Sequence, residues 1–349
     1  MTSPTPLGFG IVGTGLIAGF HARALARLEG VRLAAVCNRR EATARRFAAE
    51  HGAAFVANSP AELAARPDVD VVCVATPSGA HLEPALAAIA AGKHVVVEKP
   101  LEISLARVDR LLAAAAEARV LVVPVFQGRF GDGARMVHAA VAAGRLGRLV
   151  LASAAVKWHR PAAYYTGWKG VLELDGGGAL INQAIHALDL LQWFAGQPEE
   201  VFARTARRVH TAIEAEDTAV ATLRFPGGAL GTIEATTAAW PGWSRRLELC
   251  GESGSIRLED DVITRWEFAK AEPADEEILR GRGADALGSG AAAPGAISLE
   301  GHVRQLRDLV DAIRENRPPA LTGRDGRNAV ALVLALYASA RRGEPVAPA

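Results

Sequence analysis

The chain has 349 residues, more than one domain usually holds, so we expect two domains with separate cores. Its 39 basic and 38 acidic side chains leave a formal charge of +1, which excludes a strong overall field for nucleic acid or an anionic membrane and favours a small, neutral or mildly polar substrate. The chain has three cysteines, two of them in apolar strand-like runs, so we expect no structural disulfides. We see no secretion-signal pattern and no run near the roughly 20 apolar residues of a membrane span, so we expect a cytoplasmic protein.

The first element is an apolar strand at 7–12, followed by the glycine-rich run 13–18 and a helical pattern. A strand, a tight glycine turn and a helix start are the context of a dinucleotide-binding fingerprint. Gly13 permits the turn, Gly15 lets the backbone approach a pyrophosphate, and the small Ala18 keeps the helix close to the strand. The cofactor-binding residues predicted here are Gly13, Thr14, Gly15, Leu16 and Ile17.

The end of the second strand, 31–37, bears on the choice of nicotinamide cofactor. A carboxylate at this position would hold the ribose hydroxyls of NAD, whereas this chain has Asn38, Arg39 and Arg40. Guanidinium groups suit a 2′-phosphate, so the sequence predicts NAD(P) binding with a preference for NADP. The alternative is that one or both arginines are solvated at the start of the next helix.

The alternation of strands and helices continues after this point. A buried strand at 69–75 ends in the loop 76–81, a helix covers 82–91, and a further strand covers 94–97. Ligands of open α/β sheets lie at the carboxyl ends of the strands, so Thr76, Pro77 and His81 are predicted to contact the cofactor. For His81 the alternative is a place at the start of the helix. The pattern predicts an N-terminal Rossmann domain, a doubly wound parallel sheet.

Glu98, Lys99 and Pro100 follow the fourth predicted strand. A lysine before proline is extended, and at a strand's carboxyl end its amine would point into the cofactor crevice and could donate a proton. We therefore predict that Glu98 and Lys99 bind the cofactor, the alternative being a surface Glu–Lys pair. A helix at 104–118 and a strand at 120–126 complete the predicted dinucleotide-binding domain, 1–126.

The second predicted domain, 127–349, begins with Gln127 at the crossing point, a predicted cofactor contact. A helix at 134–143 and a strand at 147–154 lead to the segment 157–169, which is dense in aromatic and polar residues. Aromatic rings with polar tips suit the apolar faces and hydroxyls of sugars, although ordinary packing of a long loop is the alternative. The substrate-binding residues predicted from this part of the chain are Arg129, Trp158, Tyr164, Tyr165 and Trp168.

A glycine-rich turn and a helix follow at 174–189. Read as an α-helix, this segment places Asn182, His186 and Asp189 at i, i+4 and i+7, on one face. We predict that these three residues are catalytic and that Asn182 and His186 also bind substrate. The alternative is a helix with one satisfied buried histidine.

Several strands follow, at 200–209, 217–225, 228–237, 245–250 and 254–258. The turn after Phe225 joins two alternating strands, which predicts a largely antiparallel sheet in an α+β domain. Its second face would be available for a partner subunit, giving a homodimer or homotetramer. Residues 271–296 are expected to form a surface loop or a lid, and helices at 302–315 and 326–341 to pack back on the first domain.

Three motifs in this order resemble the Gfo/Idh/MocA oxidoreductase family: the glycine fingerprint at 10–18, Glu98-Lys99-Pro100, and 176–178 with His186 and Asp189. The resemblance implies an open-faced C-terminal sheet and pyranose or cyclitol substrates. It also implies that Lys99 and His186 line the reacting carbon beside the nicotinamide. Inositol dehydrogenase-like members carry an aspartate where this chain has Asn182. The motif that contains Asn182 and His186 in this chain looks more like the corresponding motif of nucleotide-sugar and hexose dehydrogenases.

The expected activity is hydride transfer between a secondary hydroxyl of a sugar or cyclitol and nicotinamide, without a metal. His186 would take the hydroxyl proton and Lys99 would stabilise the developing alkoxide. Asn182 and Asp189 would position the substrate or the histidine. Two alternatives remain open: glycoside cleavage through a transient redox cycle, and a cofactor-binding module without catalysis.

Overall fold

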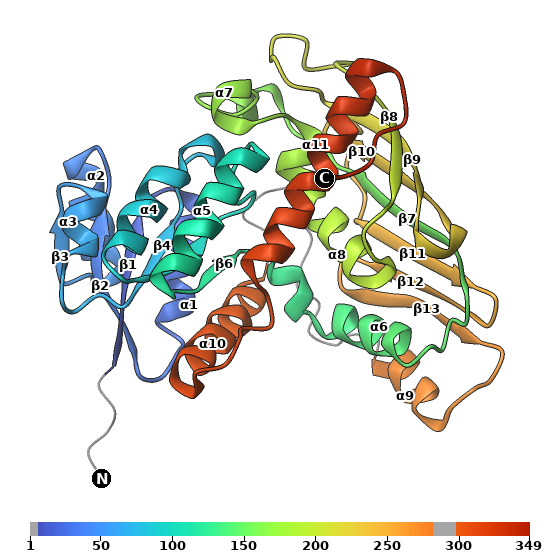
Figure 1. Ribbon diagram of the computed structural model, residues 1–349, viewed down its shortest axis with the longest axis horizontal. Helices are drawn as coiled ribbons and strands as arrows, with labels where there is room; N and C mark the ends of the chain where they lie inside the picture. Colours follow the sequence, from blue (N-terminus) through green and yellow to red (C-terminus); the bar gives the residue numbers. More distant parts are fainter. Residues whose placement is uncertain (1–5, 282–297) are drawn as a thin grey trace. The chain divides into compact units, whose positions relative to one another are not determined.

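The computed structural model describes residues 6–281 and 298–349, and the chain divides into two compact units (Figure 1). Unit 1 comprises Met1–Val125 and His302–Arg327. Unit 2 comprises Phe126–Gly301 and Asn328–Ala349. Each unit is therefore formed by two separate segments of the chain, and the last helix starts in unit 1 and continues into unit 2.

Unit 1 contains a six-stranded parallel sheet in the order β3-β2-β1-β4-β5-β6, which confirms the predicted doubly wound fold. Its strands are β1 (Leu7–Val12), β2 (Val31–Cys37), β3 (Phe55–Ala57), β4 (Val71–Val74), β5 (His94–Val97) and β6 (Val122–Pro124). Its helices are α1 (Leu16–Leu25), α2 (Glu41–His51), α3 (Pro60–Ala64), the short η1 (Ser78–Ala80), α4 (Leu82–Ala90), α5 (Leu105–Ala118) and, almost entirely, α10 (Glu300–Glu315).

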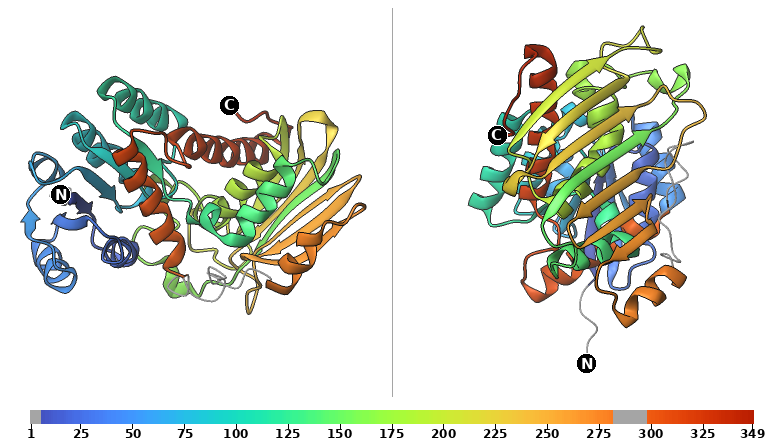
Figure 2. Two further views of the ribbon diagram at one scale, coloured as in Figure 1. Left: turned by 90° about the horizontal axis from the view of Figure 1, so that it is seen from below. Right: turned by 90° about the vertical axis from the view of Figure 1, so that its right-hand side faces the viewer.

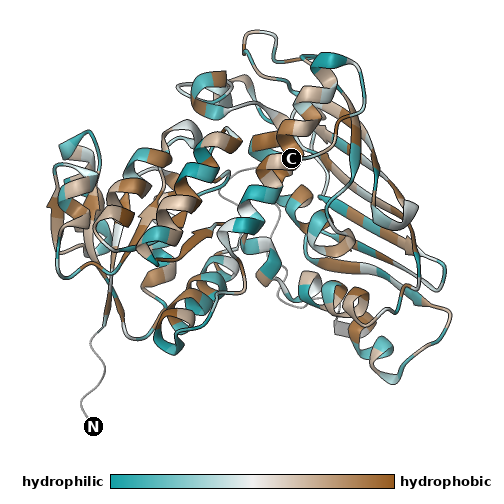
Figure 3. Cartoon of the chain, in the orientation of Figure 1, coloured by the Kyte–Doolittle hydropathy of each residue, from teal (hydrophilic) through white to brown (hydrophobic). Residues whose placement is uncertain are grey.

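The central strands of unit 1 are short, valine-rich and buried on both faces, as a parallel sheet covered by helices requires. Figure 3 shows them as hydrophobic segments. Because β1 pairs with both β2 and β4, the strand order reverses between β1 and β4. Ligands of such sheets bind outside the carboxyl ends of the strands at this reversal. The short β3 and α3 were not predicted.

Unit 2 contains a seven-stranded sheet in the order β13-β12-β11-β7-β10-β9-β8. Its strands are β7 (Leu149–Lys157), β8 (Glu200–Ala206), β9 (Thr218–Arg224), β10 (Leu230–Thr236), β11 (Arg246–Gly251), β12 (Gly254–Glu259) and β13 (Val262–Phe268). All neighbours are antiparallel except β10 and β7, so the prediction of a largely antiparallel sheet is confirmed.

The helical segments of unit 2 include one π-helix. They are η2 (Gln127–Phe130), α6 (Asp132–Ala142), η3 (Ala162–Tyr165), α7 (Leu172–Asp175), the π-helical η4 (Ala179–Ala184), α8 (Ile185–Ala195), η5 (Pro226–Gly228), α9 (Pro273–Gly281) and most of α11 (Gly323–Arg342). Helix α8 packs on β7 and β11, so the glycine-rich segment before it lies against the sheet of the same unit.

Residues alternate along the strands of unit 2 between a face packed on helices and an open face. Ala152, Ala154 and Val156 of β7 are buried, whereas Leu151 on the same strand and Leu230 on β10 are exposed. The right-hand view of Figure 2 looks onto the open face, which no described helix of unit 2 crosses. One face of the sheet therefore builds the core and the other stays accessible within the described chain.

Two predictions for the last third of the chain need correction. Residues 262–268 form the strand β13, which was not predicted. Part of the predicted loop at 271–296 forms helix α9, whose acidic first turn complements the helix dipole. Residues 282–296 lie outside the described residues. In the described part of the chain, no helix combines the length and the apolar character that a membrane crossing needs.

Candidate active site

The glycine loop after β1 has the backbone that the fingerprint predicts. Gly13 has a φ of +98°, and a Cβ there would lie 2.4 Å from the carbonyl oxygen of Ala75, so no other residue fits without distortion. The Gly13 amide donates to the carbonyl of Cys37 at 2.9 Å. The loop therefore lies against the carboxyl ends of both β2 and β4.

Gly15 leaves open space at the start of α1. It is the N-cap residue, it is exposed, and a Cβ placed on it would meet no described atom within 4 Å. No side chain of the described residues caps the first turn of α1, and Ala18 is fully buried against the sheet. Open space beside uncapped helix amides is what a pyrophosphate group requires, so these residues fit a dinucleotide. Leu16 and Ile17 occupy the first turn, exposed and half-buried respectively.

Asn38 links the end of β2 to the glycine loop. Its side-chain amide donates to the hydroxyl of Thr14 at 2.5 Å, and its carbonyl oxygen accepts the amide of Arg40 at 2.9 Å. Arg39 and Arg40 are exposed beside it. The structure therefore brings Thr14, Asn38 and the two arginines to one corner of unit 1.

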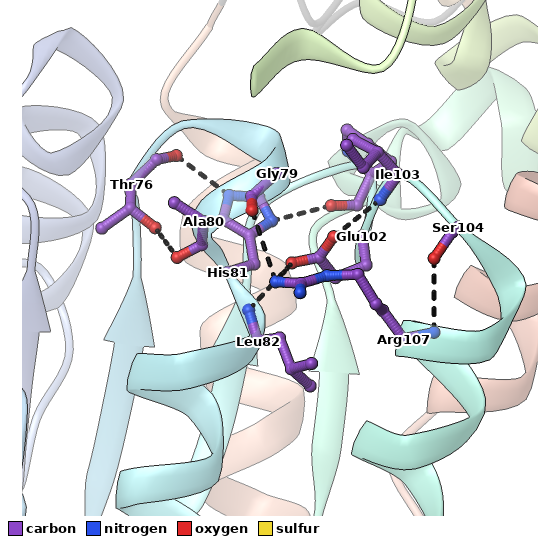
Figure 4. A network of polar contacts seen from close by, with 10 residues as sticks. Thr76, Gly79, Ala80, His81, Leu82, Glu102, Ile103, Ser104 and Arg107 are labelled. Carbon is purple, nitrogen blue, oxygen red and sulfur yellow. Dashed lines mark hydrogen bonds and ion pairs between the residues drawn. The ribbon is translucent and has the colours of Figure 1, made fainter. Parts of the chain in front are cut away.

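The loops after β4 and β5 are tied together by His81 (Figure 4). Its ring nitrogens lie 2.9 Å from the carbonyl oxygens of Thr76 and Pro100, and only 1 % of the residue is exposed. Burial lowers the pKa of His81, while the hydrogen bonds to the two carbonyl oxygens and the nearby carboxylates of Glu102 and Glu98 act to raise it. The ring nitrogens of His81 therefore face protein groups, whereas Thr76 and Pro77 stay half-buried at the strand end, and the predicted cofactor contacts of the three residues stay predictions.

Glu102 makes the second tie between these loops, and sequence reasoning missed it. Its fully buried carboxylate accepts the backbone amide of Leu82 at 3.0 Å and a guanidinium N–H of Arg107 at 2.9 Å. Arg107 in turn approaches the carbonyl of Gly79 at 3.4 Å (Figure 4). The turn that carries Lys99 is therefore braced by buried polar contacts. The local signal in the sequence is a glutamate two residues before the N-cap serine of α5, Ser104.

Glu98 faces the interior of unit 1. Its carboxylate lies 2.9 Å from Nε2 of His21 and accepts the amide of Lys99 at 3.2 Å, and the residue is 6 % exposed. Burial acts to raise the pKa of Glu98, but the hydrogen bond from His21 and the nearby positive groups lower it to about 2. Glu98 therefore supports the backbone of Lys99, a residue that is itself half-buried, and the predicted cofactor contact of Glu98 stays a prediction.

The glycine-rich turn of unit 2 is shaped by close backbone contacts. A Cβ on Gly178 would lie 1.8 Å from the carbonyl oxygen of Glu216, and Gly177 has a φ of +158°. Asp175 is buried beside the turn; its carboxylate accepts the backbone amide of Gly170 at 2.8 Å and the side-chain amide of Asn182 at 2.6 Å. The turn therefore holds Asn182 by its side chain.

The segment that bears Asn182 is a π-helix, and α8 starts only at Ile185. The prediction of one α-helical face over 182–189 is therefore wrong before Ile185, because a π-helix has a different period. Asn182 and His186 are both half-buried. The Tyr164 hydroxyl lies 3.4 Å from the side-chain oxygen of Asn182, and Phe126 packs edge-on against the ring of His186.

Asp189 and Arg129 pair with each other. The guanidinium of Arg129 donates to the two carboxylate oxygens of Asp189 at 2.9 and 2.7 Å, and the residues are 8 % and 1 % exposed. Arg129 also lies over the ring of Trp193. The two residues form a buried ion pair that joins η2 to α8, and their predicted roles, Asp189 in catalysis and Arg129 in substrate binding, stay predictions.

The aromatic segment divides into packed and accessible residues. Trp158 and Arg160 are buried, with the guanidinium over the indole ring, and Tyr165 hydrogen-bonds the hydroxyl of Thr237. The Tyr164 ring faces the amine of Lys169 at 3.5 Å, so Tyr164 joins the cluster around Asn182. The remaining predicted residues, Trp168 and Gln127, are half-buried.

Unit 1 thus carries Lys99 and the predicted cofactor residues except Gln127, and unit 2 carries Gln127, Asn182, His186 and Tyr164. Within the described ranges, no group of three or more His, Cys, Asp or Glu side chains is arranged to hold a metal ion.

The chain is similar to known oxidoreductases along nearly its whole length. Residues 7–126 match the family described as "Oxidoreductase family, NAD-binding Rossmann fold", and residues 134–257 match the GFO/IDH/MocA C-terminal domain. It is 30 % identical to myo-inositol 2-dehydrogenase of Thermotoga maritima, covering 93 % of each chain, and 28 % identical to 1,5-anhydro-D-fructose reductase of Ensifer adhaerens, covering 96 % of this chain and 97 % of the relative.

A solved structure is similar over the same extent. It is the WlbA dehydrogenase from Bordetella pertussis in complex with NADH and UDP-GlcNAcA, with a TM-score of 0.88, 32 % identity and 99 % coverage of both chains. Sequence and fold agree with the geometry of the glycine loop described above. The chain therefore belongs to the Gfo/Idh/MocA family and is an oxidoreductase with an NAD-binding Rossmann domain.

Proposed function

We propose that this oxidoreductase transfers a hydride between a secondary hydroxyl of a sugar, sugar derivative or cyclitol and a nicotinamide dinucleotide. The observation that carries the proposal is the open amide cradle at Gly15, in the same unit as a half-buried lysine at the end of β5. Relatives named as inositol dehydrogenase and anhydrofructose reductase support this substrate class.

In the proposed mechanism the bound nicotinamide supplies the hydride acceptor or donor. Lys99 and His186 both hydrogen-bond the reacting hydroxyl. The imidazole of His186 takes the hydroxyl proton, and the ammonium group of Lys99 stabilises the negative charge that develops on the oxygen. In the reverse direction the same pair returns a proton to the carbonyl oxygen of the ketone.

Asn182 is proposed to orient a neighbouring hydroxyl of the substrate. Its amide cannot ionise, so it cannot raise the basicity of His186 as an aspartate would. Because Asp175 accepts one of its N–H groups, the amide has a defined orientation. Tyr164 and Trp168 are proposed as ring contacts, whereas Trp158 packs with Arg160.

We propose a nucleotide-linked sugar as the preferred substrate. The Asn182–Gln183 form of the motif supports this choice over inositol, and the similar dehydrogenase from Bordetella pertussis was solved with UDP-GlcNAcA. The test is a panel of nucleotide sugars, free monosaccharides, cyclitols and glycosides, with nicotinamide reduction followed by absorbance. If the enzyme turns over none of these compounds, the proposal is wrong. Aglycone release without net cofactor reduction would indicate glycoside cleavage instead.

For the cofactor we propose a preference for NADP over NAD, supported by the exposed guanidinium groups of Arg39 and Arg40 beside Asn38. The similar solved structure contains NADH, so the two cofactors have to be compared directly. We expect a lower KM for NADP and a selective rise of that KM when both arginines become alanine. A lower KM for NAD in the wild type would overturn this preference.

For assembly we propose a homodimer or homotetramer through the open face of the sheet in unit 2. The exposed side chains of Leu151, Val220 and Leu230 give this face an apolar character. We also propose a cytoplasmic location, supported by the free thiols of Cys37, Cys73 and Cys250.

A further inference from the structure

Four successive amides at the start of the π-helix are satisfied by two residues that are remote in sequence. The carboxylate of Glu216 accepts the amides of Gly178 at 2.9 Å and Leu180 at 2.8 Å. The backbone carbonyl of Glu216 accepts the amide of Ala179 at 3.0 Å. The hydroxyl of Tyr337, on α11, lies 3.3 Å from the amide of Ile181 and 3.2 Å from that of Gly178.

The first four amides of a helix have no partner within the helix, so an unsatisfied set would be costly in a buried place. Here Glu216 is 8 % exposed, and the Tyr337 hydroxyl donates to its carboxylate at 2.9 Å. Burial raises the pKa of Tyr337, so this hydroxyl remains a donor. Glu216 and Tyr337 therefore form one cap, with the tyrosine as both acceptor and donor.

The cap determines where the helix begins. The amide of Asn182 is the next along the chain, and it donates to the carbonyl of Gly178 at 3.0 Å. The residues that follow the four capped amides include Asn182 and, after the change to α-helix, His186. A shift of the cap by one residue would turn both side chains around the helix axis.

We propose that Glu216 and Tyr337 are positioning residues that hold the π-helical turn and thereby place Asn182 and His186 for hydride transfer. This inference rests on the proposed function, since it assumes that Asn182 and His186 act on the substrate. Neither residue of the cap contacts the reacting atoms in this scheme. Their effect passes through the backbone of residues 178–181.

The principal variant is Tyr337→Phe, which removes one hydroxyl and keeps the ring. Glu216→Gln is the second variant, because its amide N–H₂ would face backbone donors. Ser339→Ala is the matched control: Ser339 lies on the same helix, is fully buried, and uses its hydroxyl for the amide of Ala203 at 3.0 Å and the carbonyl of Glu344 at 2.7 Å. The control therefore removes a buried hydroxyl of α11 that does not touch the glycine turn.

We expect Tyr337→Phe and Glu216→Gln to lower kcat by about 10- to 100-fold while the Kd of the dinucleotide changes less than about twofold. Amide exchange at 178–181 should be faster in both. Ser339→Ala should lower the Tm to a similar extent as Tyr337→Phe and retain the wild-type kcat. Wild-type kcat in both cap variants, or an equal kcat loss in the control, would overturn the inference.

The NMR titration of His186 in the protein without substrate separates this inference from the proposed function. If the wild type turns over no sugar, the proposed function fails, but the cap can still be judged. Cap variants that shift the titration midpoint of His186, with no shift in Ser339→Ala, would support positioning. An unchanged midpoint in both cap variants would overturn it whatever the enzyme acts on.

Discussion

The ion pair of Arg129 and Asp189 offers the sharpest test of how unit 2 supports its active-site helix. Both side chains are buried, and the guanidinium donates to both carboxylate oxygens. Arg129→Met keeps an unbranched apolar chain over Trp193 but leaves a buried carboxylate without this partner. Loss of one member of a buried pair costs about 3 to 5 kcal/mol.

Arg245 lowers the expected cost. It is half-buried, and Asp189 is one of the three aspartates whose charge acts on it, so part of the compensation survives in Arg129→Met. We therefore expect a loss of about 3 kcal/mol in the free energy of unfolding, the lower end of the range. In the double variant Arg129→Met/Asp189→Leu the stranded carboxylate is gone, so stability should return to within about 1 kcal/mol of the wild type.

Urea denaturation followed by tryptophan fluorescence measures these changes, with separate fits for the two units if the transition is not two-state. A loss below about 1 kcal/mol in Arg129→Met would refute the reasoning, because a buried carboxylate that loses its two-fold hydrogen bond to a guanidinium should cost more than that. Turnover of the folded fraction tests the predicted catalytic role of Asp189. A kcat loss in Asp189→Asn that exceeds the loss of folded protein would support the catalytic prediction, and a kcat loss that only follows the loss of folded protein would contradict it.

Four further predictions follow from the structure. Lys99→Ala and His186→Ala should each lower kcat by roughly 100-fold or more with little change in the dinucleotide Kd, measured by NADH fluorescence; unchanged turnover in both removes the mechanism. Gly13→Ala should weaken NADH binding at least tenfold and lower the Tm, because its Cβ would overlap the Ala75 carbonyl; wild-type affinity would contradict this. The pKa of Glu216 is raised by burial to about 7 from 4.5, so its contribution to stability is present below pH 4.5 and is lost as the pH rises to 7. Wild type should therefore lose about 3 kcal/mol over that range relative to Glu216→Gln; equal pH profiles would contradict it. Leu230→Glu on the open sheet face should reduce the assembly mass in light scattering, whereas Val209→Glu, exposed outside the strands, should not.

The fold of unit 1 is predictable because its information is local. Apolar runs, glycine turns and helix caps lie next to one another in the sequence, and the central strands are buried on both faces. Strand β3 and helix α3 escaped prediction because each spans only a few residues, too short to show a period. The identity of Lys99 as a residue at a strand end was also readable, since proline follows it directly.

Burial of the polar residues was harder to predict. Glu98 and His81 lie in motifs typical of a cofactor site, and only the fold shows that His21 and the carbonyls of two loops take their polar atoms. The same holds for Arg129 and Asp189, which are 60 residues apart. A motif tells which residue types are present, whereas long-range contacts decide which of their atoms face a ligand.

The π-helix illustrates the limit of helical periodicity. Residues 179–189 contain good helix formers, and an α-helical spacing is the natural reading of Asn182, His186 and Asp189. The local period changes because four amides find partners in Glu216 and Tyr337, which lie far away along the chain. Since π-helical turns cost backbone energy and occur often at functional sites, their presence needs such outside support. A sequence with the same helix formers but without the glutamate and the tyrosine should therefore form a regular α-helix here, with Asn182 facing another direction.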